Sequence, residues 1–68
     1  MSLKNYLKKN NISNYMLSKK SDVAESTISQ FVNNKRGITL ETACKLADAL
    51  GITLDKFREL TRGEGRIE

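Results

Sequence analysis

The 68-residue sequence contains no histidine and no proline, and Cys44 is its only cysteine. One cysteine excludes an internal disulfide, and one cysteine without histidine excludes a structural zinc site. A lone thiol fits a reducing compartment. We expect Cys44 to be a small buried apolar residue, with a redox role as the alternative.

Long apolar runs are also absent. No stretch approaches the roughly 20 residues that span a bilayer, and the N-terminus lacks the apolar stretch of a signal peptide. We therefore expect a soluble, cytoplasmic protein. The chain also lacks a glycine-rich phosphate loop and an organised carboxylate pair, so we expect neither an enzyme nor a bound cofactor.

The positive charge is concentrated in the first half of the chain. The net charge is +4, of which residues 1–36 contribute +5 and residues 37–68 contribute −1. A surface that is basic on one side suits a polyanion such as DNA or an acidic membrane. A basic surface with no such partner fits the charge equally well, so charge alone does not identify a function.

Apolar residues recur at helical spacing and predict an all-α fold of five short helices in one domain, residues 1–62. The expected N-caps are Ser2, Ser13, Thr39 and Thr53. The third helix is expected over about 25–33, and the fourth ends at Gly51 in a left-handed conformation. Residues 63–68 are polar and contain glycine, which predicts a flexible C-terminal tail. The predicted apolar stripe of the fourth helix comprises Leu40, Ala43, Cys44, Ala47 and Leu50.

The second and third predicted helices are joined by about three residues, which is typical of a helix-turn-helix. We expect the turn to be Ser21-Asp22-Val23, with Val23 filling the angle between the helices. Ser18 is expected to be small because the third helix crosses close to it, and its hydroxyl could bond to the Asn14 carbonyl. The shared core of the two helices is predicted from Leu17, Ile28 and Phe31.

The outward face of the third helix carries polar side chains and neither lysine nor arginine. A merely solvated face tends to carry Lys, Glu and Arg, which favour the helix. Serine, asparagine and glutamine cost helix propensity but can hydrogen-bond to base edges. The composition favours base contact over a solvated face. The residues of this stripe are Glu25, Ser26, Ser29, Gln30 and Asn33.

Two segments in this order resemble the Cro/CI-type (XRE-type) helix-turn-helix family. They are SNYMLSKKSDVAESTISQFVNNK, residues 13–35, and LETACKLADALGITLD, residues 40–55. The family patterns S-x-x-x-L-A-x-x-x-G-V-S-x-S-T-I-S, N-G-K and L-x-K-L-A-x-A-L-G-V-S-L-D are traceable in them, and the likeness covers roughly residues 3–61. The resemblance implies a compact lambda-repressor-like domain of five helices.

The resemblance also implies a dimer that binds a pseudo-palindromic operator in double-stranded DNA. The implied base-contacting residues are Glu25, Ser26, Ser29 and Gln30, at the start of the third helix. The implied DNA backbone contacts are Asn14, Thr27, Asn34, Lys35 and Arg36. Self-association would help a core of this size, which rarely contributes more than about 3–5 kcal/mol. The candidate dimer interface is Ile52, Leu54, Phe57 and Leu60, although these residues, and Phe57 above all, could instead close the monomer core.

Several positions depart from the family pattern. Asp22 and Asn34 replace glycines, and both residue types tolerate a left-handed backbone. Ala24 replaces the usual capping serine, so Asp22 and Glu25 could form an alternative capping pair, which would make the role of Glu25 structural. Leu7 and Val32 occupy positions where many relatives carry an ion pair, and we expect these two side chains to touch.

Three functions are compatible with these features. The first is a stand-alone transcriptional repressor. The second is the antitoxin of a toxin–antitoxin pair, which would bind DNA and also contact a toxin. The third is a protein-interaction module that has lost DNA binding, and the polar stripe of the third helix argues against it.

Overall fold

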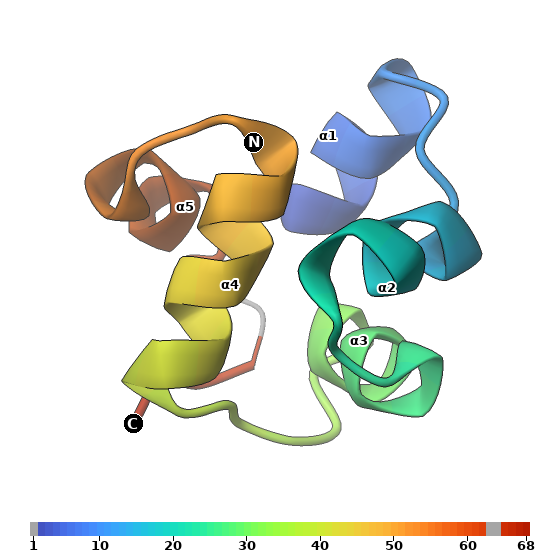
Figure 1. The fold of residues 1–68 in the computed structure, drawn as a ribbon. Helices are drawn as coiled ribbons and strands as arrows, with labels where there is room; N and C mark the ends of the chain where they lie inside the picture. The colour runs from blue at the N-terminus through green and yellow to red at the C-terminus, as the bar shows by residue number, and fades with distance from the viewer. Residues whose placement is uncertain (1, 63–64) are drawn as a thin grey trace.

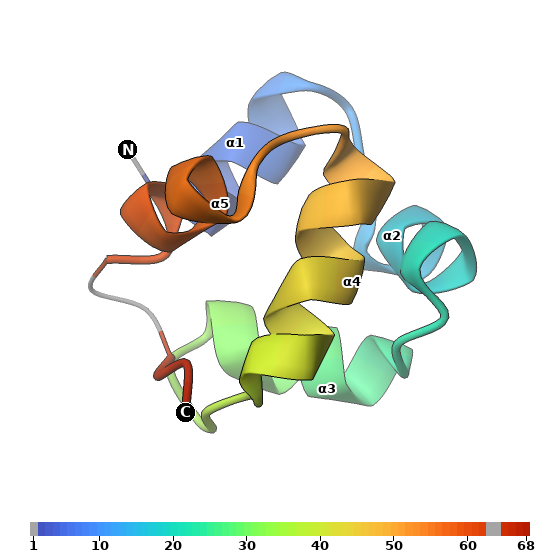
Figure 2. The same ribbon diagram turned by 60° about the vertical axis from the view of Figure 1, so that its left-hand side comes forward.

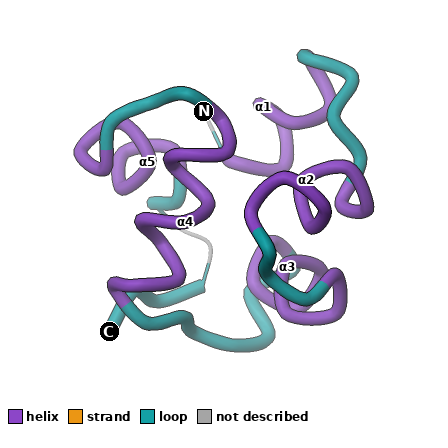
Figure 3. Tube along the Cα trace, viewed as in Figure 1, coloured by secondary structure: helices purple, strands orange, loops and turns teal. Residues whose placement is uncertain are grey.

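The computed structural model describes residues 2–62 and 65–68, and these residues form five helices joined by short loops (Figures 1 and 3). The all-α fold class is therefore confirmed. The helices are α1 (Leu3–Lys9), α2 (Asn14–Ser21), α3 (Glu25–Val32), α4 (Leu40–Leu50) and α5 (Leu54–Leu60). No helix in the described part of the chain is long and apolar enough to cross a membrane.

Four of these helices begin at the predicted hydroxyl caps. Each hydroxyl accepts a hydrogen bond from the backbone N–H three residues later, which satisfies a donor that the helix itself leaves free. The oxygen–nitrogen distances are 3.1–3.2 Å at Ser2, Ser13, Thr39 and Thr53. The exception is α3, which begins at Ala24 without a side-chain cap. Its position therefore depends on packing more than on local capping.

Left-handed residues end four helices. Asp22 follows α2 with φ of 61°, while Asn11, Asn34 and Gly51 follow α1, α3 and α4. After α3, the N–H of Asn34 donates to the carbonyl of Phe31 (3.0 Å) and that of Lys35 donates to Gln30 (2.8 Å). This pair of bonds is the Schellman motif. The left-handed geometry expected at Asp22 and Asn34 is thus confirmed.

Helix α4 lies at the centre of the fold. It packs against α2 on one side and α5 on the other, while α2 also packs on α3 and α1 on α5 (Figures 1 and 2). The rings of Phe31 and Phe57 stack in the core, with centroids 6.3 Å apart. The fully buried side chains of largest volume are Phe31, Phe57, Leu3, Leu17, Ile28 and Leu46.

The buried face of α4 differs from the predicted stripe. Ala43, Leu46 and Ala47 are buried, whereas Cys44 is exposed and Leu40 is 44% exposed. Successive residues are about 100° apart around a helix. Because α4 contacts two partners, its buried face is centred near Ala43 and turned toward Leu46, which places Cys44 outside it. The expectation of a buried Cys44 is wrong.

Residues 65–68 lie against the domain. Ile67 forms a parallel β-bridge with Ile38 and packs on the core. The structure therefore places these four residues beside the loop that precedes α4, where the sequence predicts part of a flexible tail. Residues 63–64, the beginning of the predicted tail, lie outside the described residues.

Gly51 allows a test of the helix-ending geometry. Its φ is 71°, and a Cβ built on it would meet no atom within 4 Å, so only backbone strain opposes a side chain there. We predict that Gly51→Ala lowers the free energy of unfolding by about 1–2 kcal/mol. Gly51→Asn should lower it less, because asparagine tolerates this conformation. Urea denaturation measures both, and equal losses for the two variants would contradict this explanation.

Candidate nucleic-acid interface

The turn between α2 and α3 sets the position of α3. It comprises Asp22, Val23 and Ala24, one residue later than predicted, because α2 continues through Ser21. The buried Ser21 hydroxyl donates to the Leu17 carbonyl (2.6 Å) and accepts from the N–H of Val23 (3.3 Å). Val23 is itself buried, as expected. The hydroxyl that bonds back into α2 is thus that of Ser21, whereas Ser18, predicted for this role, is half-exposed.

Helix α3 is anchored by its inner face. Ile28 and Phe31 are fully buried and Val32 is nearly so, as the predicted shared core requires. On the outer face Glu25, Ser26 and Gln30 are exposed, and Ser29 is half-buried. The side chains of these four residues make no hydrogen bond or ion pair within residues 2–62 and 65–68. The outer face is therefore a row of donors and acceptors available to a ligand.

Asn33, the last residue of the predicted stripe, is bonded internally. Its Nδ2 donates to the carbonyl of Ser29 (2.8 Å), and its Oδ1 accepts from Nζ of Lys4 (3.4 Å). The first bond lies within the end of α3, and the second connects it to α1. Asn33 therefore has a structural function that the other members of the stripe lack.

The alternative of an Asp22–Glu25 capping pair is wrong. Asp22 ends α2 in the left-handed region, whereas an N-cap residue has extended φ and ψ. Ala24 is the N-cap of α3 and provides no side-chain hydrogen bond. Glu25 lies in the first turn, where a carboxylate is favourable to the helix dipole. Its side chain remains exposed beside Ser26.

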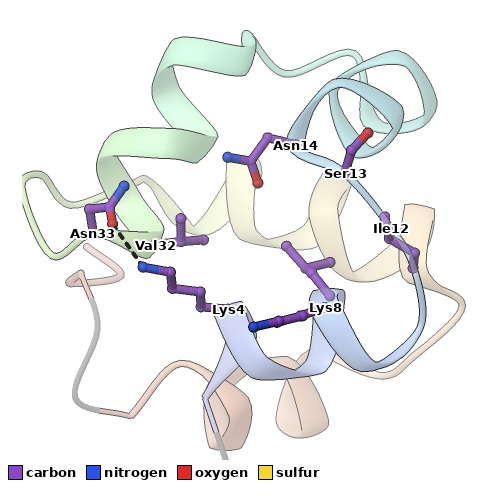
Figure 4. Close-up of a pocket in the computed structure, with 8 residues that line it drawn as sticks. Lys4, Lys8, Ile12, Ser13, Asn14, Val32 and Asn33 are labelled. Atoms are coloured by element: carbon purple, nitrogen blue, oxygen red, sulfur yellow. Dashed lines mark hydrogen bonds between the residues drawn. The ribbon is translucent and has the colours of Figure 1, made fainter.

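A groove with basic and amide side chains on its rim lies between α1, the start of α2 and the end of α3 (Figure 4). Asn14, a predicted DNA backbone contact, lines it together with Lys4, Lys8 and Asn33. The two lysines were not among the residues predicted for DNA contact. Their spacing of four residues in a basic first helix was the signal, but only the packing of α1 on the other helices places them near Asn14.

Leu7 and Val32 line the same groove. Both are buried, with 4% and 7% of their surface exposed, and both belong to the main hydrophobic cluster. Their placement agrees with the expected apolar contact in place of an ion pair. An apolar pair avoids the cost of desolvating two charges.

The remaining predicted DNA backbone contacts lie along α3 and in the loop after it. Thr27 is half-buried, whereas Asn34, Lys35 and Arg36 are exposed. The Schellman bonds at Asn34 and Lys35 hold the first part of this loop against the end of α3. Lys4 reaches the same end of α3 through Asn33, so basic side chains gather there.

The four candidate dimer residues differ in accessibility. Phe57 and Leu60 are 0% and 2% exposed and close the core of the chain. Ile52 and Leu54 are partly buried against the core and retain exposed surface. The dimer prediction therefore rests on Ile52 and Leu54.

No three His, Cys, Asp or Glu side chains gather as metal ligands in the part of the chain that the structure describes. The side chains on the outer face of α3 are amide, hydroxyl and carboxylate groups. This chemistry suits hydrogen bonding to a polar partner. The surrounding lysines and arginines suit an anionic one.

The Ser21 hydroxyl provides a second test. We predict that Ser21→Ala lowers the free energy of unfolding by about 1–3 kcal/mol, because it leaves the buried Val23 N–H without an acceptor. Ser18→Ala in the same helix is the control and should change stability by less than about 0.5 kcal/mol. Thermal or urea denaturation distinguishes the two. A larger loss for the Ser18 variant would reverse the assignment of the hydroxyl.

Comparison with known protein families agrees with this geometry. The family model HTH_3, described as Helix-turn-helix, matches residues 3–57. No curated protein and no solved structure matches the chain significantly. The matched segment covers most of the chain and contains the turn and the exposed face of α3. This chain belongs to the XRE (Cro/CI-type) helix-turn-helix family, whose domains bind DNA and regulate transcription.

Proposed function

We propose that this protein is a cytoplasmic transcriptional repressor that inserts α3 into the major groove of double-stranded DNA. The observation that carries the proposal is the exposed outer face of α3, whose four side chains have no hydrogen-bond or ion-pair partner among the residues that the structure describes. A glutamine can bond adenine N6 and N7, a carboxylate can accept from cytosine N4, and serine suits either kind of base edge. Gln30, Glu25, Ser26 and Ser29 would make these contacts.

The phosphate contacts would surround this face. The N-terminus of α2 with Asn14 would bind one phosphate, since free backbone N–H groups and the helix dipole attract anions. Thr27 and the loop of Asn34, Lys35 and Arg36 would bind others, and Lys4 and Lys8 lie close enough to Asn14 to contribute. Binding of this kind weakens steeply with salt. Glu25 would repel phosphates and so disfavour non-specific complexes.

A homodimer would bind the two halves of a pseudo-palindromic operator. One domain of this size covers one half-site, and two-fold related domains contact half-sites about 34 Å apart along the duplex. Ile52 and Leu54 retain the exposed apolar surface that such an interface needs.

An antitoxin would use the same DNA-binding face and also contact a toxin. Tyr15 and Met16, which are 57% and 44% exposed on α2, are large apolar side chains available for a protein partner. Co-purification with the product of a neighbouring gene would support this alternative. Failure to enrich any sequence from a random DNA pool would favour the third alternative, an interaction module without DNA binding.

Gln30 and Lys35 separate base contact from phosphate contact. The duplex is first selected from a random pool, and affinities are then measured by fluorescence anisotropy on that duplex and on a scrambled one. We predict that Gln30→Ala costs about 1–3 kcal/mol on the selected duplex and little on the scrambled one. Lys35→Ala should weaken both about equally.

The two substitutions serve as controls for each other, because both truncate an exposed side chain near the end of α3. If Gln30→Ala weakens both duplexes to the same degree, Gln30 does not contact a base. If the wild-type chain enriches no sequence from the random pool, the proposed function itself is wrong.

A further inference from the structure

Residues 65–68, which we call the strap, are bonded to the segment between α3 and α4. The Ile38 N–H donates to the carbonyl of Arg66 (2.7 Å), and the Glu68 N–H donates to the carbonyl of Ile38 (2.7 Å). The Leu40 N–H donates to the carbonyl of Glu68 (3.1 Å). Leu40 is the first residue of α4, so the strap also satisfies a backbone donor that α4 leaves free.

Gly65 brings the strap to the end of α3. Its N–H donates to the carbonyl of Phe31 (3.3 Å). A Cβ at this position would overlap the carbonyl oxygen of Arg36 and come within 2.5 Å of Cδ1 of Phe31. Only a residue without a side chain fits there. The strap is thus in direct contact with the loop that is expected to bind the DNA backbone.

The contact adds a third cation to this loop. Arg66 belongs to the strap, and Lys35 and Arg36 belong to the loop after α3. All three line the same groove. The backbones are close, since a Cβ on Gly37 would lie 2.8 Å from the Arg66 carbonyl oxygen. The Glu68 carboxylate lies near Gly37 as well, with Oε1 3.2 Å from that Cβ position. Among the described residues, three cationic side chains and one side-chain carboxylate lie in this region, so positive charge is in excess there.

We propose that the strap completes the phosphate-binding surface, with Arg66 as a further contact to the DNA backbone and Gly65 as a positioning residue for the loop of Asn34, Lys35 and Arg36. The inference rests on the proposed function, because the ligand of Arg66 is the same duplex that α3 contacts. Arg66 and the loop would bind phosphates beyond the C-terminal end of α3, next to the base-contacting residues on its outer face.

The salt dependence of binding tests Arg66. Arg66→Gln removes the charge and leaves the backbone bonds of the strap intact. We predict that, for each bound domain, it reduces the slope of log K against log salt by about 0.9 and weakens binding about fivefold to tenfold at 0.1 M salt, on selected and scrambled duplexes alike. The control is Arg58→Gln, which removes the same charge from an exposed position of α5, in a surface lined by Asp55, Glu59 and Arg62.

If the wild-type chain binds DNA but the slope of log K against log salt is the same for Arg66→Gln and Arg58→Gln, Arg66 does not contact a phosphate. The proposed function would then still hold. Absence of binding by the wild-type chain overturns both.

Hydrogen exchange without DNA tests the positioning role of Gly65. We predict that the amides of Ile38 and Leu40 are protected in the wild-type chain, because both donate to the strap. In Gly65→Ala both should exchange faster, while the amides of Leu46 and Ala47 in the middle of α4 keep their protection.

The Gly65→Ala variant should also bind both duplexes more weakly than Arg66→Gln does, because it disturbs the loop as well as Arg66. Unchanged exchange at Ile38 and Leu40, or weakening no greater than that of Arg66→Gln, would overturn the positioning role.

Discussion

The stacked rings of Phe31 and Phe57 connect α3, the helix that we propose faces the DNA, to the rest of the core. The rings are nearly parallel, at 8°, and neither has any exposed surface. Burying one such side chain contributes roughly 1.5–3 kcal/mol, a large part of the stability expected for so small a core. Gly65 of the strap packs directly against the ring of Phe31. Because α3 has no side-chain cap, this contact and its neighbours Ile28 and Val32 hold its outer face in place.

The helices and their ends could be predicted from the sequence because they depend on neighbouring residues. Each hydroxyl cap accepts a hydrogen bond from the backbone N–H three residues later, at Ser2, Ser13, Thr39 and Thr53. Gly51 ends α4 through its own left-handed conformation. The rotation of α4 could not be predicted in this way. It depends on α2 and α5 together, and for that reason Cys44 was placed on the wrong face.

In the candidate DNA-binding surface, too, some residues could be predicted from the local sequence, whereas others are brought together only by tertiary packing. The exposed polar row of α3 follows from composition and helical spacing within eight residues. Lys4 and Lys8 lie near Asn14 only because the fold places α1 beside the start of α2. Arg66 lies near Lys35 only because Gly65 fits closely against Phe31 and Arg36. A polar segment with two glycines has the composition of a mobile tail. The four described residues of that segment are held by hydrogen bonds to backbone groups, and these depend little on side-chain identity.

We propose that one surface of this domain, formed by α3 and the basic residues around its C-terminal end, binds the DNA. The most direct measurement is an NMR titration of the full chain with a duplex selected from a random pool, following every assigned backbone amide. We predict that the largest shift changes fall on α3, the start of α2, the loop of residues 34–36 and the strap. Shift changes concentrated on the exposed residues of α4 and α5, such as Lys45, Lys56 and Arg58, would contradict it.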